Sequence, residues 1–504
     1  MTHLTRRRAL GLIGACSLGA ARGRSAPLAF QPTWESLKQY RCPEWFRDAK
    51  LGVFLHWGPM SVPGVDAWYA RNMYMEGSKA YRFHLQTYGH PSKFGYKDII
   101  PLWKAEKFDP DYLVGVFKKA GARYIVPVAV HHDNFDCWNS KRHRWNSVNM
   151  GPRKDIVVLW REATLKQGLR FGVSEHLERA YSWLNTSKGS DKTGPHAGVP
   201  YDGNDPRYRE FYLEPHDDTN PAYPRNPPES WKRAWLARIT DLVDSYQPDL
   251  LYTDGGVPFG AAGLSLIAHF YNANRQRHGG RLEAVYNIKN FLPRTDHGEF
   301  QEGMCVEDLE RGVLDRIKPE PWQTDTCIGD WFYYTEHSYK TVRSVVHTLV
   351  DIVSKNGNLL LNIPLKPEGD LDADAARFLR EFSDWMAVNS EALHGTRPWW
   401  VFGAGPTRVA GGQFAEAKTE QFTSADIRFT SRDGVLYAIA LGWPAKELLM
   451  RSLAEGAPHA PRISRVQMLG VKEPLKWSRT GAGLRVEMPP QRPCDHAFAL
   501  RLSL

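Results

Sequence analysis

Eight short apolar runs recur between residues 51 and 363 of this chain. Continuous apolar stretches of this length are typical of strands that are buried on both faces of a sheet. Segments with helical spacing separate several of the runs, and in one of them apolar side chains share a helix face from Trp231 to Tyr246. The runs are Leu51–His56, Tyr124–Val130, Arg170–Val173, Leu250–Thr253, Ala284–Asn287, Met304–Val306, Thr324–Ile328 and Leu359–Ile363.

Alternation of buried strands with helices predicts a parallel sheet covered by helices. Eight such units favour an α/β fold in which residues 27–395 form a TIM-like (β/α)8 barrel. An open doubly wound sheet is the alternative, but no G-x-G-x-x-G follows any run, so the usual dinucleotide site of such sheets is missing. Residues Phe291 to Gly303 join the fifth and sixth runs without a helical pattern, and we expect the barrel to be irregular there.

The pattern changes after a helical segment at Ala373–Leu393. The segments that follow are short and strand-like, and Gly, Pro and Asp separate them. We therefore expect residues 396–504 to form a C-terminal antiparallel β-sandwich domain. Its expected strands are Thr407–Ala410, Ile427–Ser431, Leu436–Leu441, Val466–Leu469 and Leu484–Met488.

The first 26 residues have the features of an export signal. Three arginines, Arg6 to Arg8, precede an apolar stretch, and small residues end at Ala26, which predicts a twin-arginine signal cut before Pro27. The mature protein is then exported, to the periplasm or outside the cell. A basic tail before a first helix is one alternative, and a lipoprotein anchored at Cys16 is another. The apolar stretch is too short to span a bilayer, so no integral membrane segment is expected.

Charge and cysteine spacing argue against several classes of partner. The net charge is +9, but five of the arginines lie in the first 26 residues, so the remainder is nearly balanced. We therefore expect no nucleic acid partner. The six cysteines form no C-x-x-C pair, which gives no signal for a zinc site. If His131 and His132 continue the strand, they point to opposite faces, and one ion is hard for both to reach unless the pair has left the strand. No metal and no cofactor are predicted.

Titratable or polar residues follow almost every apolar run. In a barrel the carboxyl ends of all strands meet at one face, where catalytic groups lie. Asp254 with Gly255-Gly256 is either a common turn or a nucleophile beside a point of close substrate approach. A glycosidase needs at least two carboxylates at one rim of the barrel, and Asp254 with a glutamate of the Glu307 to Glu310 cluster would supply them. The residues concerned are His56, His131, His132, Glu175, His176, Asp254, Lys289, Glu307 to Glu310, Asp325 and Asn362.

Four segments resemble the glycoside hydrolase family 29 α-L-fucosidases and occur in that family's order: residues 51–63, 131–141, 353–364 and 394–399. The resemblance implies a retaining exo-acting enzyme with a barrel and a β-sandwich, acting on fucosylated oligosaccharides or glycoconjugates. It also implies that Asp254 is the nucleophile. Where many members have Glu-Trp, this chain has Ala67-Trp68 with Asp66 beside it. By the same resemblance, the residues that line the fucose pocket are His56, Trp68, His131, His132, Tyr252 and Trp331.

Two glutamates are candidates for the acid/base. If the sixth strand extends from Val306 to Glu310, side chains alternate, so Glu310 and Glu307 lie on opposite faces and only one can reach the site. Glu-Arg-Gly at Glu310 resembles the acid-bearing segment of some family members more closely, so we favour Glu310 and keep Glu307 as the alternative. A carbohydrate-binding barrel without catalysis, and a retaining glycosidase for another sugar, are the competing functions.

Overall fold

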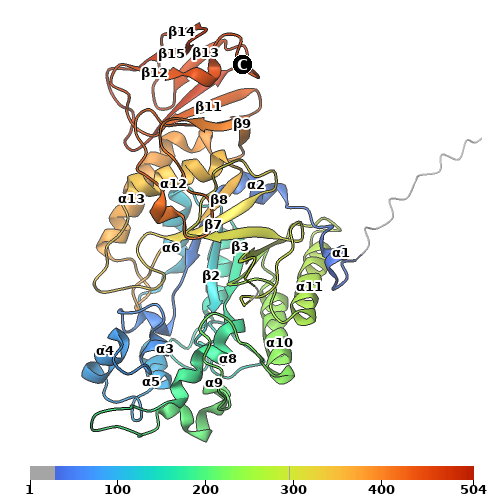
Figure 1. The fold of residues 1–504 in the computed structure, drawn as a ribbon, viewed down its shortest axis with the longest axis vertical. Coiled ribbons are helices and arrows are strands. Elements are labelled where there is room, and N and C mark those ends of the chain that lie inside the picture. The colour runs from blue at the N-terminus through green and yellow to red at the C-terminus, as the bar shows by residue number, and fades with distance from the viewer. Residues whose placement is uncertain (1–28, 295) are drawn as a thin grey trace, which may run out of the picture.

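The computed structural model describes residues 29–294 and 296–504. The export signal expected at residues 1–26, with Cys16, lies outside this range. Eight parallel strands close into a barrel in chain order, with β8 paired to β1, so the predicted barrel is confirmed (Figure 1). The strands are β1 (Leu51–Leu55), β2 (Tyr124–Val130), β3 (Arg170–Glu175), β4 (Leu250–Thr253), β5 (Val285–Lys289), β6 (Val306–Glu310), β7 (Trp322–Cys327) and β8 (Gly357–Asn362).

The sixth strand differs most from its predicted boundaries, and the seventh begins two residues earlier than predicted. Polar residues fill both: β6 continues through Glu310, and β7 begins at Trp322 and includes Asp325. Apolar periodicity misses such residues, although the ladder pairs them regularly, with Glu310 opposite Asp325. The charged end of β6 is therefore extended backbone, which was the condition for the two glutamates to face opposite ways.

Helices cover the outside of most of the barrel. No helix separates β5 from β6 or β6 from β7 within the described residues, so the barrel is irregular as expected. Its covering helices are α6 (Pro110–Lys119), α7 (Ile156–Lys166), α10 (Glu229–Tyr246), α11 (Ala261–Arg277), α12 (Val342–Ser354) and α13 (Ala373–Asn389).

The remaining helices of the barrel region are short. Those numbered α3 to α5, α8 and α9 lie at the end of the molecule away from the C-terminal sheets (Figure 1). They belong to the long connections after β1 and β3, which extend the carboxyl face of the barrel. The set is α1 (Trp34–Leu37), α2 (Glu44–Ala49), η1 (Pro59–Ser61), α3 (Tyr69–Asn72), α4 (Lys79–Thr87), α5 (Tyr96–Ile99), η2 (Ile100–Leu102), η3 (Leu177–Arg179), α8 (Ala180–Trp183), η4 (Leu184–Lys188), η5 (Asp202–Asn204), η6 (Pro206–Tyr208), α9 (Arg209–Tyr212) and η7 (Ser390–Ala392).

Two antiparallel sheets follow the barrel, a five-stranded sheet in the order β13-β16-β11-β10-β9 and a three-stranded sheet in the order β12-β15-β14. The predicted C-terminal antiparallel fold is confirmed. Short helices η8 (Glu416–Lys418) and η9 (Arg451–Leu453) lie in its loops. The strands are β9 (Arg397–Ala404), β10 (Ile427–Arg432), β11 (Val435–Ala440), β12 (Glu447–Met450), β13 (Arg465–Met468), β14 (Trp477–Thr480), β15 (Gly483–Glu487) and β16 (Phe498–Ser503).

The strand predicted at Thr407–Ala410 is wrong, and the strand in this region is β9. Gly405 has a φ of 136°, and Pro406 follows it, so the extended ladder ends at Ala404. The side chain of Asp426 then accepts the backbone N–H of Thr407 at 3.1 Å, where a strand would need a neighbouring carbonyl.

The five-stranded sheet packs against the barrel with one face and against the smaller sheet with the other. Along β11, Tyr437 and Ile439 belong to the barrel core, whereas Leu436 and Ala438 belong to the core between the two sheets. This is the alternation expected of a strand buried on both faces. Trp385 of α13 also donates its indole N–H to the carbonyl of Ala497 at 2.9 Å. Among the described residues, no helix is both long and apolar enough to cross a membrane.

Candidate active site

One cavity of about 350 Å³ opens at the carboxyl ends of the barrel strands. It receives side chains from the ends of β1, β2, β4 and β6 and from the loop after β7, which are far apart in sequence. Six of the predicted pocket and catalytic residues line it together with Glu310: His56, Trp68, His131, His132, Asp254 and Trp331.

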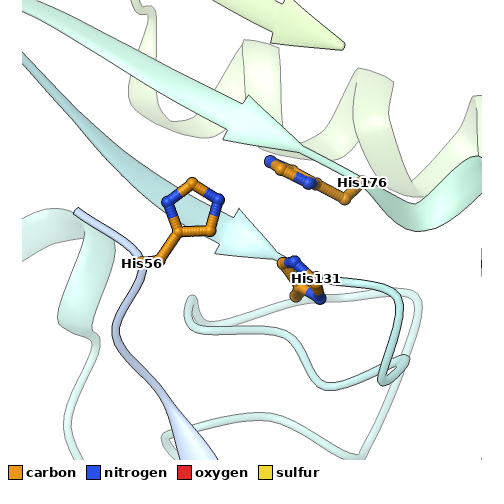
Figure 2. Close-up of side chains that lie close together, drawn as sticks. All are labelled: His56, His131 and His176. Atoms are coloured by element: carbon orange, nitrogen blue, oxygen red, sulfur yellow. The ribbon is translucent and has the colours of Figure 1, made fainter. Parts of the chain in front are cut away.

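Three buried histidines form one wall of this cavity. His56, His131 and His176 follow β1, β2 and β3, and Figure 2 shows their rings grouped beside the ends of these strands. The backbone N–H of His56 donates to Asn362 Oδ1 at 3.0 Å, and its Nδ1 lies 2.9 Å from the same oxygen. Asn362 at the end of β8 therefore fixes the orientation of the first histidine.

The ring nitrogens of this group lie within 4.8 Å of one another, a spacing that by itself admits a metal ion. The rings of His131 and His176 are stacked, however, with centroids 4.8 Å apart and planes 28° apart. Because imidazole lone pairs lie in the ring plane, stacked rings do not direct them at one point. Sugar hydroxyls fit better, since neutral imidazole both donates and accepts. The absence of a metal stays a prediction.

Burial keeps these imidazoles uncharged. It lowers the pKa of His56 and of His131 well below the ordinary value, and the neighbouring histidines lower both further. Burial also lowers the pKa of His132 to about 4, although the nearby Asp254 carboxylate opposes the shift. The cavity wall is therefore a neutral hydrogen-bonding surface at neutral pH.

We expect His132 to stay neutral from pH 8 down to pH 5 and to take up a proton only near pH 4. Its folded-state pKa lies below the unfolded value, so proton uptake is favoured only at the lower pH. Nitrogen-15 NMR of labelled ring nitrogens, assigned with the variant His132→Gln, would measure the midpoint. A midpoint near about 6.5, the value for an exposed histidine, would contradict this expectation.

Asp254 follows β4 and is surrounded by cationic and imidazole groups. Its Oδ1 accepts from Lys289 Nζ at 2.5 Å, and its Oδ2 lies 3.2 Å from Arg179 Nη2. Oδ2 also lies 3.4 Å from His132 Nε2 and 3.4 Å from His176 Nδ1. Burial alone would raise the pKa of Asp254, but the charges of Arg179 and Lys289 outweigh it and hold that pKa well below its usual value. Asp254 is therefore an ionised carboxylate in a largely dry site.

Lys289 at the end of β5 connects the two candidate catalytic carboxylates. Its Nζ donates to Asp254 Oδ1 at 2.5 Å and to Glu310 Oε2 at 2.6 Å. Since both oxygens contact one nitrogen, they are at most about 5 Å apart. Burial would lower the pKa of Lys289, but Asp254 and Glu310 raise it instead, so the ammonium stays charged.

Glu307 does not line the cavity. Asn290 Nδ2 donates to its Oε1 at 2.9 Å, and Lys318 Nζ pairs with its other oxygen. Glu310, three residues further on, faces the cavity together with Asp254. The alternation expected from an extended β6 thus separates the two glutamates.

Tyr252 lies below the cavity and is fully buried. Its hydroxyl oxygen lies 3.2 Å from Asp308 Oδ2 and 3.0 Å from Asp325 Oδ2. Lys289 Nζ lies 6.0 Å from the centre of its ring. Tyr252 is not among the cavity-lining residues, and its hydroxyl faces Asp308 and Asp325. Its place in the fucose pocket stays a prediction.

The two glycines after Asp254 also differ from expectation. A Cβ on Gly256 would lie 2.6 Å from the carbonyl oxygen of Glu299, and one on Gly255 would lie 3.1 Å from that of His297. The backbone N–H of Gly256 donates to the carbonyl of His297 at 2.6 Å. Because these glycines have no side chain, the loop after β5 packs directly against the Asp254 turn. The space beside them is filled by that loop and not by a substrate.

Arg179 was not among the predicted site residues, although it contacts both the carboxylate and the backbone carbonyl of Asp254. It lies in η3, four residues past the end of β3, so it follows no apolar run directly. A charged pair, Glu178-Arg179, within an otherwise apolar stretch was the available signal. Both side chains are buried, and Arg179 Nε lies 3.4 Å from Glu178 Oε1.

The chain matches known proteins over nearly its whole length. The family described as "Alpha-L-fucosidase" matches residues 18–391, and "Alpha-L-fucosidase C-terminal domain" matches residues 420–503. "Plasma alpha-L-fucosidase" of Homo sapiens is 29% identical over 495 residues, which cover 94% of this chain and 92% of that protein.

Solved structures agree with this match. The Thermotoga maritima α-fucosidase in complex with a mechanism-based inhibitor is 26% identical, with a TM-score of 0.72, and the match covers 94% of this chain and 100% of that one. The α-L-fucosidase isoenzyme 1 from Paenibacillus thiaminolyticus is similar in fold, with a TM-score of 0.67 at 18% identity over 93% of this chain and 99% of that one.

Proposed function

This chain belongs to the α-L-fucosidase family of glycoside hydrolases, and from that premise we propose that it is an exo-acting retaining α-L-fucosidase that removes terminal α-L-fucosyl residues from glycans. The observation that carries the retaining mechanism is the shared contact of Asp254 and Glu310 with Lys289 Nζ. It holds Asp254 Oδ1 and Glu310 Oε2 within about 5 Å of each other. Retaining glycosidases place their carboxyl groups about 5 to 5.5 Å apart, whereas inverting enzymes need roughly 6.5 to 9.5 Å to admit water.

In this proposal Asp254 is the nucleophile. Its carboxylate attacks the anomeric carbon while the glycosidic carbon–oxygen bond breaks, and Glu310 transfers its proton to the departing oxygen. Glu310 then takes a proton from water, whose oxygen displaces Asp254 and releases fucose. The low pKa of Asp254 keeps it ionised for attack at neutral pH.

The neutral histidines supply the hydroxyl contacts of the sugar pocket. His56, His131 and His132 line the cavity beside Asp254. Trp68 and Trp331 line it as well and offer flat apolar faces for the sugar ring and its methyl group. A small pocket with this balance of polar and aromatic groups suits one terminal monosaccharide, which is the requirement of an exo-acting enzyme.

Product analysis tests this function. We expect hydrolysis of an aryl α-L-fucoside and little turnover of aryl glycosides of other sugars. The first-formed fucose should retain the α configuration in proton NMR, because two displacements restore it. A β-configured first product would exclude the covalent intermediate. Activity on another sugar alone would favour a different glycosidase, and binding without turnover would favour a carbohydrate-binding barrel.

We also propose that the protein is exported through its first 26 residues. The support is in the sequence, where consecutive arginines, Arg6 to Arg8, precede an apolar stretch and a small-residue end at Ala26. A reporter fused after Ala26 should be exported in a folded state, and export should stop when Arg6 and Arg7 become lysine. Native protein that still begins at Met1 would contradict processing.

A further inference from the structure

A segment that follows β9 contacts the barrel strand that carries Glu310. The backbone N–H of Phe414 donates to the carbonyl of Glu310 at 2.9 Å, and that of Glu416 donates to the carbonyl of Arg311 at 2.9 Å. Gly412 and Val313 exchange backbone hydrogen bonds as well. Residues 412–416 thus lie along the end of β6, within the sequence predicted for the C-terminal domain.

Side chains fix this segment further. Glu416 accepts from Lys340 Nζ and from Thr326 Oγ1, both at 2.7 Å. The amide nitrogen of Gln413 lies 3.2 Å from the carbonyl of Asp308 on β6. The position of Phe414 relative to Glu310 is therefore set by several contacts on either side of it.

Phe414 itself lines the mouth of the cavity and is 49% exposed. Its φ is 55°, a left-handed conformation that is costly for a residue with a Cβ. Burial of apolar surface is what stabilises a phenylalanine side chain. Because this ring is exposed, burial offsets little of the conformational cost. Folding stability gives no reason for phenylalanine at this position, which points to contact with a ligand.

We propose that Phe414 forms the leaving-group subsite, where its ring packs against the apolar C–H face of the sugar that carries fucose. This inference rests on the proposed function, because Glu310 must protonate the glycosidic oxygen and the leaving group must then lie beside Glu310. Phe414 is hydrogen-bonded to that residue and faces the same cavity. Phe291, from the loop after β5, also lines the cavity and presents a second aromatic surface. The subsite therefore takes pyranose or aryl leaving groups.

The test compares two substrates with one fucosyl group and different leaving groups. For Phe414→Ala we expect kcat/KM on a fucosyl disaccharide to fall about ten-fold, the loss of about 1.4 kcal/mol of binding, mainly through KM. The loss on α-L-fucosyl fluoride should be far smaller, because fluoride does not reach the ring. Phe414→Trp should restore the disaccharide activity. Trp400→Ala, which removes another exposed aromatic ring from the C-terminal region, is the matched control and should leave both substrates unaffected.

Partition of the fucosyl-enzyme gives a second readout. A sugar acceptor uses the same subsite, whereas methanol does not, so Phe414→Ala should lower transfer to the sugar relative to transfer to methanol. Equal losses on both substrates would mean that the segment only positions Glu310 and would overturn the subsite, as would an unchanged disaccharide activity. An inactive wild-type protein on fucosyl fluoride would instead refute the proposed function.

Discussion

Asp254→Gly should lower turnover at least about a thousand-fold, as loss of a catalytic nucleophile does. Added azide should restore part of the rate with an aryl fucoside, because the anion can occupy the space of the lost carboxylate. Lys289 and Arg179 remain beside that space, and their charges would attract it. The product of the rescued reaction should be the β-fucosyl azide, formed by one inversion. Steady-state rates with and without azide, and NMR of the azide product, measure this.

A matched variant separates chemistry from folding. Asp249 also pairs with arginines, but it precedes β4, whereas Asp254 follows that strand, so the two lie at opposite ends of the barrel. Asp249→Asn should therefore cost stability and leave turnover near that of the wild type. Wild-type turnover in folded Asp254→Gly would refute the nucleophile assignment.

Glu310→Ala should lose about a hundred- to ten-thousand-fold in kcat on an oligosaccharide, the usual contribution of general acid catalysis. The loss should be much smaller on an aryl fucoside with a good leaving group, which needs little protonation. The structure supports this choice, because Glu310 lines the cavity and shares Lys289 with Asp254. Rates on the two substrates, measured side by side, give the leaving-group dependence.

Glu307→Ala is the control from the same strand. Its partners are Asn290 and Lys318, away from the cavity, so its loss should be mild and equal for both substrates. A large loss confined to the oligosaccharide in Glu307→Ala, with none in Glu310→Ala, would exchange the two roles.

Local sequence was sufficient for the barrel and for most of the cavity. Apolar runs mark the strands because both faces of a parallel strand are buried, and their carboxyl ends converge whatever the exact boundaries. The convergence of the strand ends alone places His56, His131 and Asp254 at one face. Strand alternation also separates Glu307 from Glu310 without any tertiary information. It does not, by itself, say which of the two faces the cavity.

Tertiary structure determined what depends on contacts between distant segments. Arg179 reaches Asp254 from a short helix after β3. Tyr252 lies below the cavity, where its hydroxyl contacts Asp308 and Asp325. Strand β9 was not predicted, although Trp399 to Phe402 form an apolar run within it. Its side chains are only partly buried, and its pairing with β10 is what identifies it as a strand.

The same distinction applies to the catalytic centre. The sequence determined which residue types end each strand, because hydrophobic patterning records burial along a single element. Only the closed barrel determined that Lys289 contacts both Asp254 and Glu310, and that Phe414 lies beside Glu310 from the far end of the chain. Neither contact produces a periodic pattern in the sequence, because each depends on the relative positions of separate elements in the folded structure.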